Sequence, residues 1–68
     1  MSRNLTPRER QVLASLTSGQ TNRQIAAELH LSVGTVKSHL TSIYGKLGVS
    51  NRTEAALVGL RMVPPLAS

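Results

Sequence analysis

The segment from Ser32 to Val49 carries the feature that most restricts the fold of this chain. Its apolar residues recur at alternating intervals of three and four positions: Val33, Val36, Leu40, Ile43 and Leu47. Because successive residues of an α-helix are rotated by about 100°, this spacing places all of them in one stripe. The opposite face carries small and polar residues and no acidic residue: Gly34, Ser38, Thr41 and Gly45, flanked by Thr35, Lys37, His39, Ser42 and Lys46.

This pattern predicts a long amphipathic helix. An apolar back and a slim, cationic front suit insertion into the major groove of DNA, which is about 12 Å wide. The alternative is a helix that only packs on a core, as most amphipathic helices of small proteins do.

Length and charge limit the possible classes of protein. The chain has 68 residues, enough for one small domain. Eight Lys and Arg residues oppose three acidic residues, so the net charge is +5, which favours a polyanionic partner, nucleic acid before a membrane surface. No cysteine is present, which excludes disulfides and thiolate metal sites and is compatible with a reducing cytoplasm. We find no apolar run of membrane-spanning length and no signal peptide in residues 1–4, so we expect a soluble, cytoplasmic protein without a membrane partner.

Boundary signals predict an all-α domain of four helices and no strands. Capping boxes begin the first, second and fourth helices, at Thr6–Glu9, Thr21–Gln24 and Asn51–Glu54, and Ser32 caps the third. Gly19 and Gly48 are expected to end the first and third helices. The fourth helix is expected over residues 52–62, before the two prolines. The domain would then span residues 5–63, between disordered tails at 1–4 and 64–68.

The second and third predicted helices are separated by only about three residues. Helices joined so closely cannot lie antiparallel with full contact, so they are expected to cross steeply, as in a helix-turn-helix. An ordinary helical corner would give the same spacing. The acid-free face of the third helix and the positive charge favour the DNA-binding interpretation.

Five segments of the chain closely resemble the LuxR-type helix-turn-helix domain of LuxR and NarL/FixJ family regulators. They follow one another in the family's order and at its spacing, over residues 5 to about 62: LTPRERQVL (5–13), GQTNRQIAAEL (19–29), LSVGTVKSHL (31–40), IYGKLGV (43–49) and NRTEAA (51–56).

The resemblance implies a four-helix domain with a central helix-turn-helix, in which helix 33–47 enters the major groove and helix 52–62 pairs two copies. Lys37 matches the family's lysine that faces the groove and touches bases or phosphates. Ser38 and Thr41 match positions whose side chains set the sequence preference. Positions near the DNA backbone are matched by Thr35, Val36 and His39.

The resemblance also implies contacts outside the middle of the third helix. Lys46 matches a cation late in that helix, whereas Gly45 departs from the family pattern, and we expect no base contact from Gly45. Ser32 is a cap, and because helix N-termini bind phosphate, capping and DNA contact are compatible. The start of the second helix, also near phosphate in the family, is matched by Thr21, Asn22 and Arg23.

Each of these residues also has a structural interpretation. Lys37 and Lys46 could be solvated surface charges, and His39 could belong to the core. Arg52 is expected to brace the fourth helix against the body of the domain rather than to read DNA. The remaining candidates could serve only as helix caps: Thr21, Asn22 and Ser32.

The fourth helix has apolar residues around most of its circumference, which suggests a second apolar surface besides the core. Two rows could supply it, and the sequence does not decide which faces the core. The row assigned to dimerisation is Ala55, Val58, Gly59 and Met62, and the other row is Ala56, Leu60 and Val63. Complete burial of the helix in a domain this small is the alternative.

The sequence gives no indication of an enzyme. Glu9 and Glu54 are assigned to capping boxes, and Glu28 has no paired acid or histidine at catalytic spacing. His30 and His39 lack partners at ligand spacing, so no metal, cofactor or small-molecule ligand is expected. We therefore expect the DNA-binding effector domain of a bacterial transcription regulator, a homodimer on double-stranded DNA, excised from a larger regulator or standing alone. The alternative is a helical protein-interaction module that contacts the transcription machinery, for instance RNA polymerase.

Overall fold

Four helices make up the computed structural model, which describes residues 4–62: α1 (Pro7–Thr17), α2 (Asn22–Leu29), α3 (Val33–Leu47) and α4 (Arg52–Met62). No strand occurs among these residues, which confirms the predicted all-α fold. The tails predicted at 1–4 and 64–68 lie outside the described part, apart from Asn4, which is exposed.

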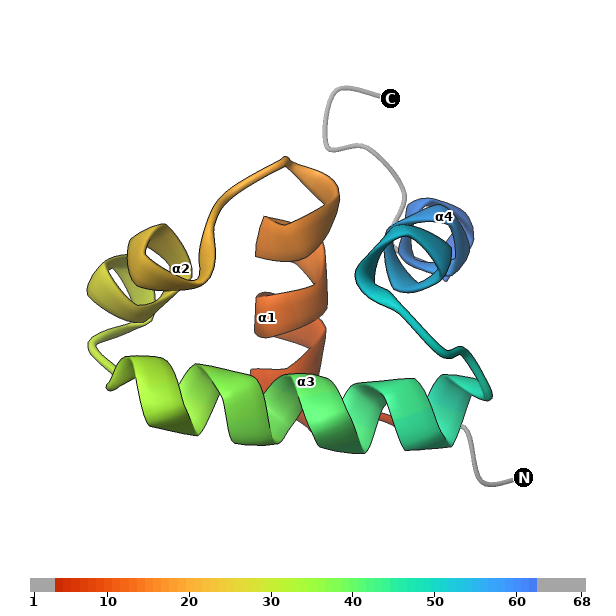
Figure 1. Ribbon diagram of the computed structural model, residues 1–68, viewed down its shortest axis with the longest axis horizontal. Coiled ribbons are helices and arrows are strands. Elements are labelled where there is room, and N and C mark those ends of the chain that lie inside the picture. Colours follow the sequence, from red (N-terminus) through yellow and green to blue (C-terminus); the bar gives the residue numbers. More distant parts are fainter. Residues whose placement is uncertain (1–3, 63–68) are drawn as a thin grey trace.

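The helices surround α1 on three sides. In Figure 1, α3 runs along the lower edge, α1 stands across it, and α2 and α4 are seen nearly end-on at opposite sides. Helix α1 packs against both α3 and α4, whereas α2 packs mainly against α3. The steep crossing of α2 and α3 is the arrangement predicted from their short connection (Figure 1).

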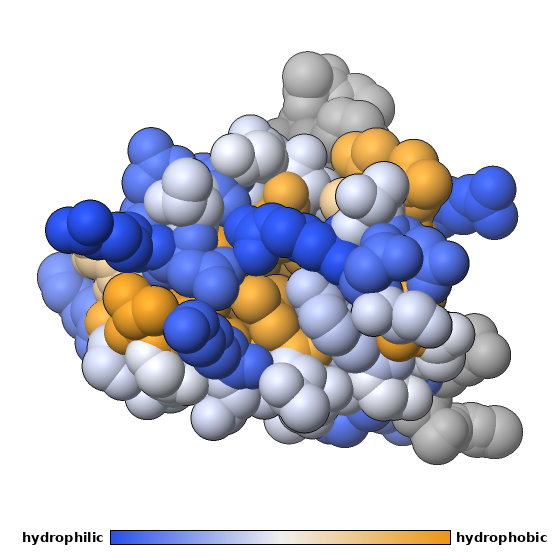
Figure 2. Space-filling model, in the orientation of Figure 1, coloured by the Kyte–Doolittle hydropathy of each residue, from blue (hydrophilic) through white to orange (hydrophobic). Residues whose placement is uncertain are grey.

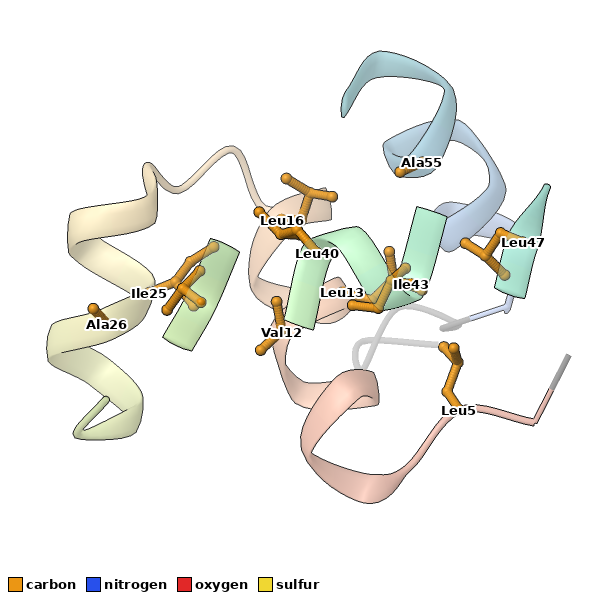
Figure 3. Packing of buried hydrophobic residues seen from close by; sticks show 11 residues of the cluster. Leu5, Val12, Leu13, Leu16, Ile25, Ala26, Leu40, Ile43, Leu47 and Ala55 are labelled. Carbon is orange, nitrogen blue, oxygen red and sulfur yellow. The ribbon is translucent and has the colours of Figure 1, made fainter. Parts of the chain in front are cut away.

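A single apolar core joins all four helices (Figure 3). The predicted stripe of α3 is confirmed: Val36 and Ile43 are fully buried, Leu40 and Leu47 nearly so, and Val33 partly. The other helices and the segment before α1 complete the core with Leu5, Val12, Leu13, Leu16, Ile25, Ala26 and Ala55.

Side-chain caps fix where the helices begin. The box at Thr6 and Glu9 has both of its hydrogen bonds, at 2.9 and 3.1 Å, and the box at Thr21 and Gln24 has both of its own, at 2.8 and 3.1 Å. Ser32 caps α3 by accepting from the Thr35 N–H at 3.1 Å. These predicted starts are confirmed.

Only one of the two hydrogen bonds predicted for the capping box at the start of α4 is present. The Asn51 side chain accepts from the Glu54 N–H at 2.9 Å, as expected. The Glu54 carboxylate instead accepts from the Ser50 N–H, at 2.8 Å, one residue before the position that a capping box requires.

The first three helices end in the same way, with a left-handed residue followed by a backbone N–H that donates to the carbonyl five residues earlier and closes the last turn. Gly19 and Gly48 take the left-handed position after α1 and α3, with φ of 84° and 70°. After α2 the position is taken by His30, with φ of 59°, and the Leu31 N–H donates to the Ala26 carbonyl at 2.8 Å.

Candidate nucleic-acid interface

The turn from α2 to α3 presents α3 at the edge of the molecule. It consists of three residues, in which left-handed His30 ends α2, Leu31 packs partly into the core and Ser32 caps α3. Because α2 and α1 cover only the apolar side of α3, the other side of α3 faces outward (Figure 1).

The outward side of α3 consists of small and hydroxyl residues with one long cation. Figure 2 shows this lower edge of the molecule as mostly pale, of weak polarity. His39, at the border of the apolar stripe, is half-buried. The exposed members are Gly34, Thr35, Lys37, Ser38, Thr41 and Gly45. None of the residues from Val33 to Leu47 is acidic, so no carboxylate on α3 would repel a phosphate group.

Two polar side chains of this face are held by their own helix. The Thr41 hydroxyl donates to the Lys37 carbonyl at 3.1 Å, so its oxygen stays available only as an acceptor. The Thr35 and Ser32 hydroxyls lie 2.9 Å apart. Lys37 itself is exposed and forms no salt bridge with any described carboxylate.

The N-terminus of α2 lies beside the start of α4. Thr21 and Arg23 are exposed, whereas Asn22 is half-buried and its Oδ1 accepts from Arg52 Nη1 at 2.7 Å. Arg52 Nη2 also donates to the Gln20 carbonyl, at 2.6 Å. Arg52 therefore braces α4 against the α1–α2 connection, as predicted, and occupies part of the hydrogen-bonding capacity of Asn22.

The structure corrects the prediction for Val36. Its side chain is fully buried between the helices, because it lies on the apolar stripe of α3, where the spacing of apolar residues in the sequence already placed it. Only the backbone of Val36 could approach DNA.

The structure also corrects the prediction for Lys46. Its Nζ lies 2.7 Å from Glu9 Oε1 in a salt bridge with a carboxylate whose side chain is 6 % exposed. Ser42 Oγ donates to the other oxygen of Glu9, also at 2.7 Å. The ammonium group is thus committed to α1, and we exclude Lys46 from the candidate interface.

These contacts lower the pKa of Glu9 from 4.5 to about 2. The hydrogen bond from Lys46 is the main cause, followed by those from Ser42 and the Thr6 N–H, while burial acts in the opposite direction. The carboxylate is therefore ionised at neutral pH, and its charge is compensated inside the domain.

The sequence prediction does not include this salt bridge, because a capping role by itself accounts for a carboxylate at position 9. A signal was nevertheless present. Glu9 lies four residues after Leu5, three before Val12 and four before Leu13, on the buried stripe of α1. A carboxylate in such a stripe needs a cationic partner from another element.

The row of α4 assigned to dimerisation faces the core, so this prediction was wrong. Ala55 is fully buried and Gly59 is buried, and Val58 is half-buried against the core. A Cβ on Gly59 would lie 2.7 Å from Thr17 Cγ2, which shows how closely α4 approaches α1. The side chain of Met62 lies outside the described part of the structure.

Among the described side chains of α4, the exposed large apolar ones are instead Leu57 and Leu60, which are 60 % and 54 % exposed. Figure 2 shows hydrophobic surface over this helix at the upper right of the molecule. Leu60 belongs to the alternative row of the sequence prediction, and Leu57 belonged to neither row.

Within residues 4–62 the structure contains no group of three or more acidic, histidine or cysteine side chains that could hold a metal ion. None of the helices described is long and apolar enough to span a membrane.

The short turn, the steep crossing and the outward-facing third helix define a helix-turn-helix domain. Residues 3–58 match the family model for bacterial regulatory proteins of the luxR family. The chain belongs to this family, as its sequence resemblance indicated.

Individual relatives support the same assignment. The chain is 59 % identical over 51 residues to the probable transcriptional regulatory protein SgaR of Hyphomicrobium methylovorum, covering 75 % of this chain and 24 % of SgaR. It is 46 % identical over 57 residues to the transcriptional regulatory protein LiaR of Bacillus subtilis, covering 84 % of this chain and 27 % of LiaR. The chain thus spans about a quarter of the length of these relatives.

A solved structure has the same fold. It is the DNA-binding domain of the response regulator ComA, in complex with the anti-activator RapF. The TM-score is 0.80 at 48 % sequence identity, and the match covers 82 % of this chain and 97 % of that domain.

Proposed function

We propose that this domain binds double-stranded DNA by inserting α3 into the major groove. The observation that carries the proposal is the outward side of α3, which is exposed, narrow and free of carboxylates, with Lys37 as its one long cation. Such a side chain can reach guanine O6 and N7 or a backbone phosphate, and small neighbours let the helix approach base edges closely.

The proposed contacts fall into two groups. Lys37, Ser38 and Thr41 are exposed on α3 and would contact base edges. Contacts with the DNA backbone would come mainly from residues at the two helix starts, where backbone N–H groups and helix dipoles favour phosphate. This second group is Thr21, half-buried Asn22 and Arg23 at the start of α2, Ser32 and Thr35 at the start of α3, and half-buried His39 in the middle of α3.

The distribution of charge supports this orientation. The net charge is +5, and the carboxylate nearest to α3, that of Glu9, is buried and neutralised by Lys46. Glu28 is held by a hydrogen bond from Ser15 on α1, and Glu54 lies on α4. The solvent-facing side of α3 therefore presents cationic charge without a compensating acid, which attracts a polyanion.

Two copies would pair through α4 on a two-fold DNA site. Leu57 and Leu60 are the exposed large apolar residues among the described side chains of this helix, and a pair of leucines from each copy can bury only part of the roughly 1,200 Å² found in a stable interface. Pairing would thus be weak in solution and strengthened on DNA, where adjacent half-sites raise the effective concentration.

At the level of the cell, we propose the effector domain of a bacterial transcription regulator that acts in the cytoplasm. The support is membership of the luxR family and the transcriptional regulators among its relatives. No catalytic role is proposed.

The experiment is a DNA-binding titration with a site selected from randomised duplexes, repeated over a range of salt concentrations. A dimer that neutralises about six phosphates would give a slope of log affinity against log salt steeper than about −5. A slope near zero would contradict DNA binding of this kind.

A second candidate function is a protein-interaction module that contacts the transcription machinery. The exposed leucines of α4 favour it, and the ComA domain was solved in complex with the protein RapF. This candidate predicts no salt-sensitive retention of DNA, so the same titration separates the two functions.

A further inference from the structure

The residues on the exposed side of α4 form a central row with a different flank on each side. Taking about 100° per residue, Thr53, Leu57 and Leu60 form a central crest. Ala56 lies on one flank of the crest, while Glu54 and Arg61 lie together on the other. Burial fixes this orientation, because Ala55 and Gly59 point into the core from the opposite side of the helix.

Glu54 and Arg61 are both exposed, and seven residues separate them along α4. At 1.5 Å per residue they are about 10 Å apart along the helix axis, too far for direct contact within one chain. Glu54 Oε1 accepts from the Ser50 N–H, which holds this carboxylate at the start of the helix. Arg61 forms no salt bridge with a described carboxylate.

We propose that these two residues make the pairing of α4 antiparallel and selective for a second copy of the same chain. The inference rests on the proposed pairing through α4 and adds its register. A two-fold axis perpendicular to two antiparallel helices places the same flank of each helix on the same side of the interface. With the axis between positions 57 and 58, Glu54 of each copy faces Arg61 of the partner subunit, and two ion pairs form.

The apolar residues agree with this register. Leu57 lies within one residue of the axis and therefore meets its own counterpart. Leu60 lies on the side of the crest nearest to Ala56, and the axis brings it opposite Ala56 of the partner subunit, so a large side chain meets a small one. The exposed side of α4, crest and flanks together, is thus self-complementary in size as well as in charge.

Other arrangements lose these contacts. A parallel two-fold pair places the charged flanks of the two copies on opposite sides of the interface, so Glu54 and Arg61 of each copy lie across from Ala56 of the partner subunit and both ion pairs are lost. A shift of the antiparallel pair by one helical turn separates Glu54 from Arg61 by about 5 Å along the axis. The charges therefore favour one register among those that the leucines alone would allow.

A shallow groove beside the charged flank offers room for the second helix. It lies between the end of α3 and α4, with Leu47 and Val49 on one side and Leu57 and Val58 on the other, and Glu54 and Arg61 contribute to its lining. A partner helix that rests on the crest would bring its own charged flank to this groove.

Charge exchange provides the test, with the 68-residue protein and a DNA fragment that carries two selected half-sites. Glu54→Arg and Arg61→Glu, each alone, should reduce the cooperativity of two-to-one binding by roughly tenfold, because both ion pairs become repulsive. An equal mixture of the two variants should restore cooperativity. The double variant Glu54→Arg/Arg61→Glu has the parent's net charge and should pair with itself as the parent does.

The mixture of parent and double variant discriminates between orientations. In the antiparallel register, a complex of one parent and one double-variant chain places like charges at positions 54 and 61 opposite each other. Mixed complexes should therefore be depleted relative to the two homodimers. A statistical mixture, which a parallel pair would give because its charged flanks lie on opposite sides of the interface, or an enrichment of mixed complexes would overturn the proposal.

A single half-site is the control that separates this proposal from the proposed function. The double variant and the parent should bind it with equal affinity, since the net charge and α3 are unchanged. Loss of binding to the single half-site by the parent itself would instead contradict the DNA-binding proposal.

Cysteine cross-linking tests the register without DNA and without changing Glu54. The chain has no cysteine, so Leu57→Cys introduces a single thiol beside the proposed axis. At high protein concentration it should form a disulfide-linked dimer at least several times faster than Leu60→Cys, which is similarly exposed but lies about 7 Å from its own counterpart along the helix axis. Equal rates, or faster linking at position 60, would overturn the register.

Discussion

Glu9 on α1 and Lys46 on α3 form a salt bridge of 2.7 Å although 37 residues separate them in the sequence. The carboxylate also closes the capping box with Thr6 and accepts from Ser42, so one buried group fixes the start of α1 against the middle and end of α3. This contact holds the proposed recognition helix in place from its inner side, and it engages Lys46 away from the surface that we propose for DNA.

The first prediction concerns the acid stability of the domain. Because the pKa of Glu9 is lowered from 4.5 to about 2, its contribution to stability is complete above pH about 4.5 and is lost as the pH falls towards 2. The melting temperature, followed by circular dichroism, should decrease over this window. Glu9→Gln should be less stable at neutral pH and should show a shallower decrease in acid, since Glu28 and Glu54 are the same in both proteins. If the melting temperatures of the two proteins decrease in parallel as the pH falls, Glu9 is not the cause of the acid sensitivity.

The second prediction concerns Lys37. Lys37→Ala should weaken specific DNA binding by about 1–3 kcal/mol and leave the melting temperature nearly unchanged, because this side chain is exposed and lies away from the apolar stripe. Arg61→Ala, measured on a single half-site, is the matched control: it removes the same charge from α4 and should have a much smaller effect. Equal losses for both variants would mean that only net charge matters.

The third prediction concerns the pairing surface of α4. Leu60→Glu should abolish two-to-one complexes on a full site and preserve the fold, because Leu60 is 54 % exposed. Val58→Glu should destabilise the domain, because Val58 is half-buried against the core. Size-exclusion chromatography at micromolar concentration should show the parent as a monomer. If both variants stay folded and still bind two to one, α4 is not the pairing surface.

The fourth prediction compares two glycines in helices. A Cβ at Gly59 would lie 2.7 Å from Thr17 Cγ2 and 2.9 Å from Cδ1 of fully buried Leu13, whereas a Cβ at exposed Gly45 meets nothing within 4 Å. Overpacking costs about 1–3 kcal/mol and exceeds the gain in helix propensity of about 1 kcal/mol, so Gly59→Ala should destabilise the domain. Gly45→Ala should instead gain up to about 1 kcal/mol, a rise of several degrees in melting temperature. An increase for both variants would show that α1 and α4 can separate slightly at no cost.

Local sequence determined the four helices and most of the core. Thr6, Thr21 and Ser32 satisfy N–H groups within three residues of themselves, so each helix start depends only on its immediate neighbours. The period of α3 likewise decides which of its sides is buried, because its apolar residues occupy a single stripe. These features were therefore predictable before any contact between helices was known.

Tertiary structure decided the orientation of α4 and the role of Lys46. Helix α4 is apolar around most of its circumference, so its sequence period does not select a buried side. The buried side is selected by the close approach of Gly59 to Thr17 and Leu13. Lys46 resembles a free surface cation until the fold places it beside a buried carboxylate of α1. Both depend on contacts between distant segments, whose energies exist only after the helices have packed, and that is why the sequence alone could not assign them.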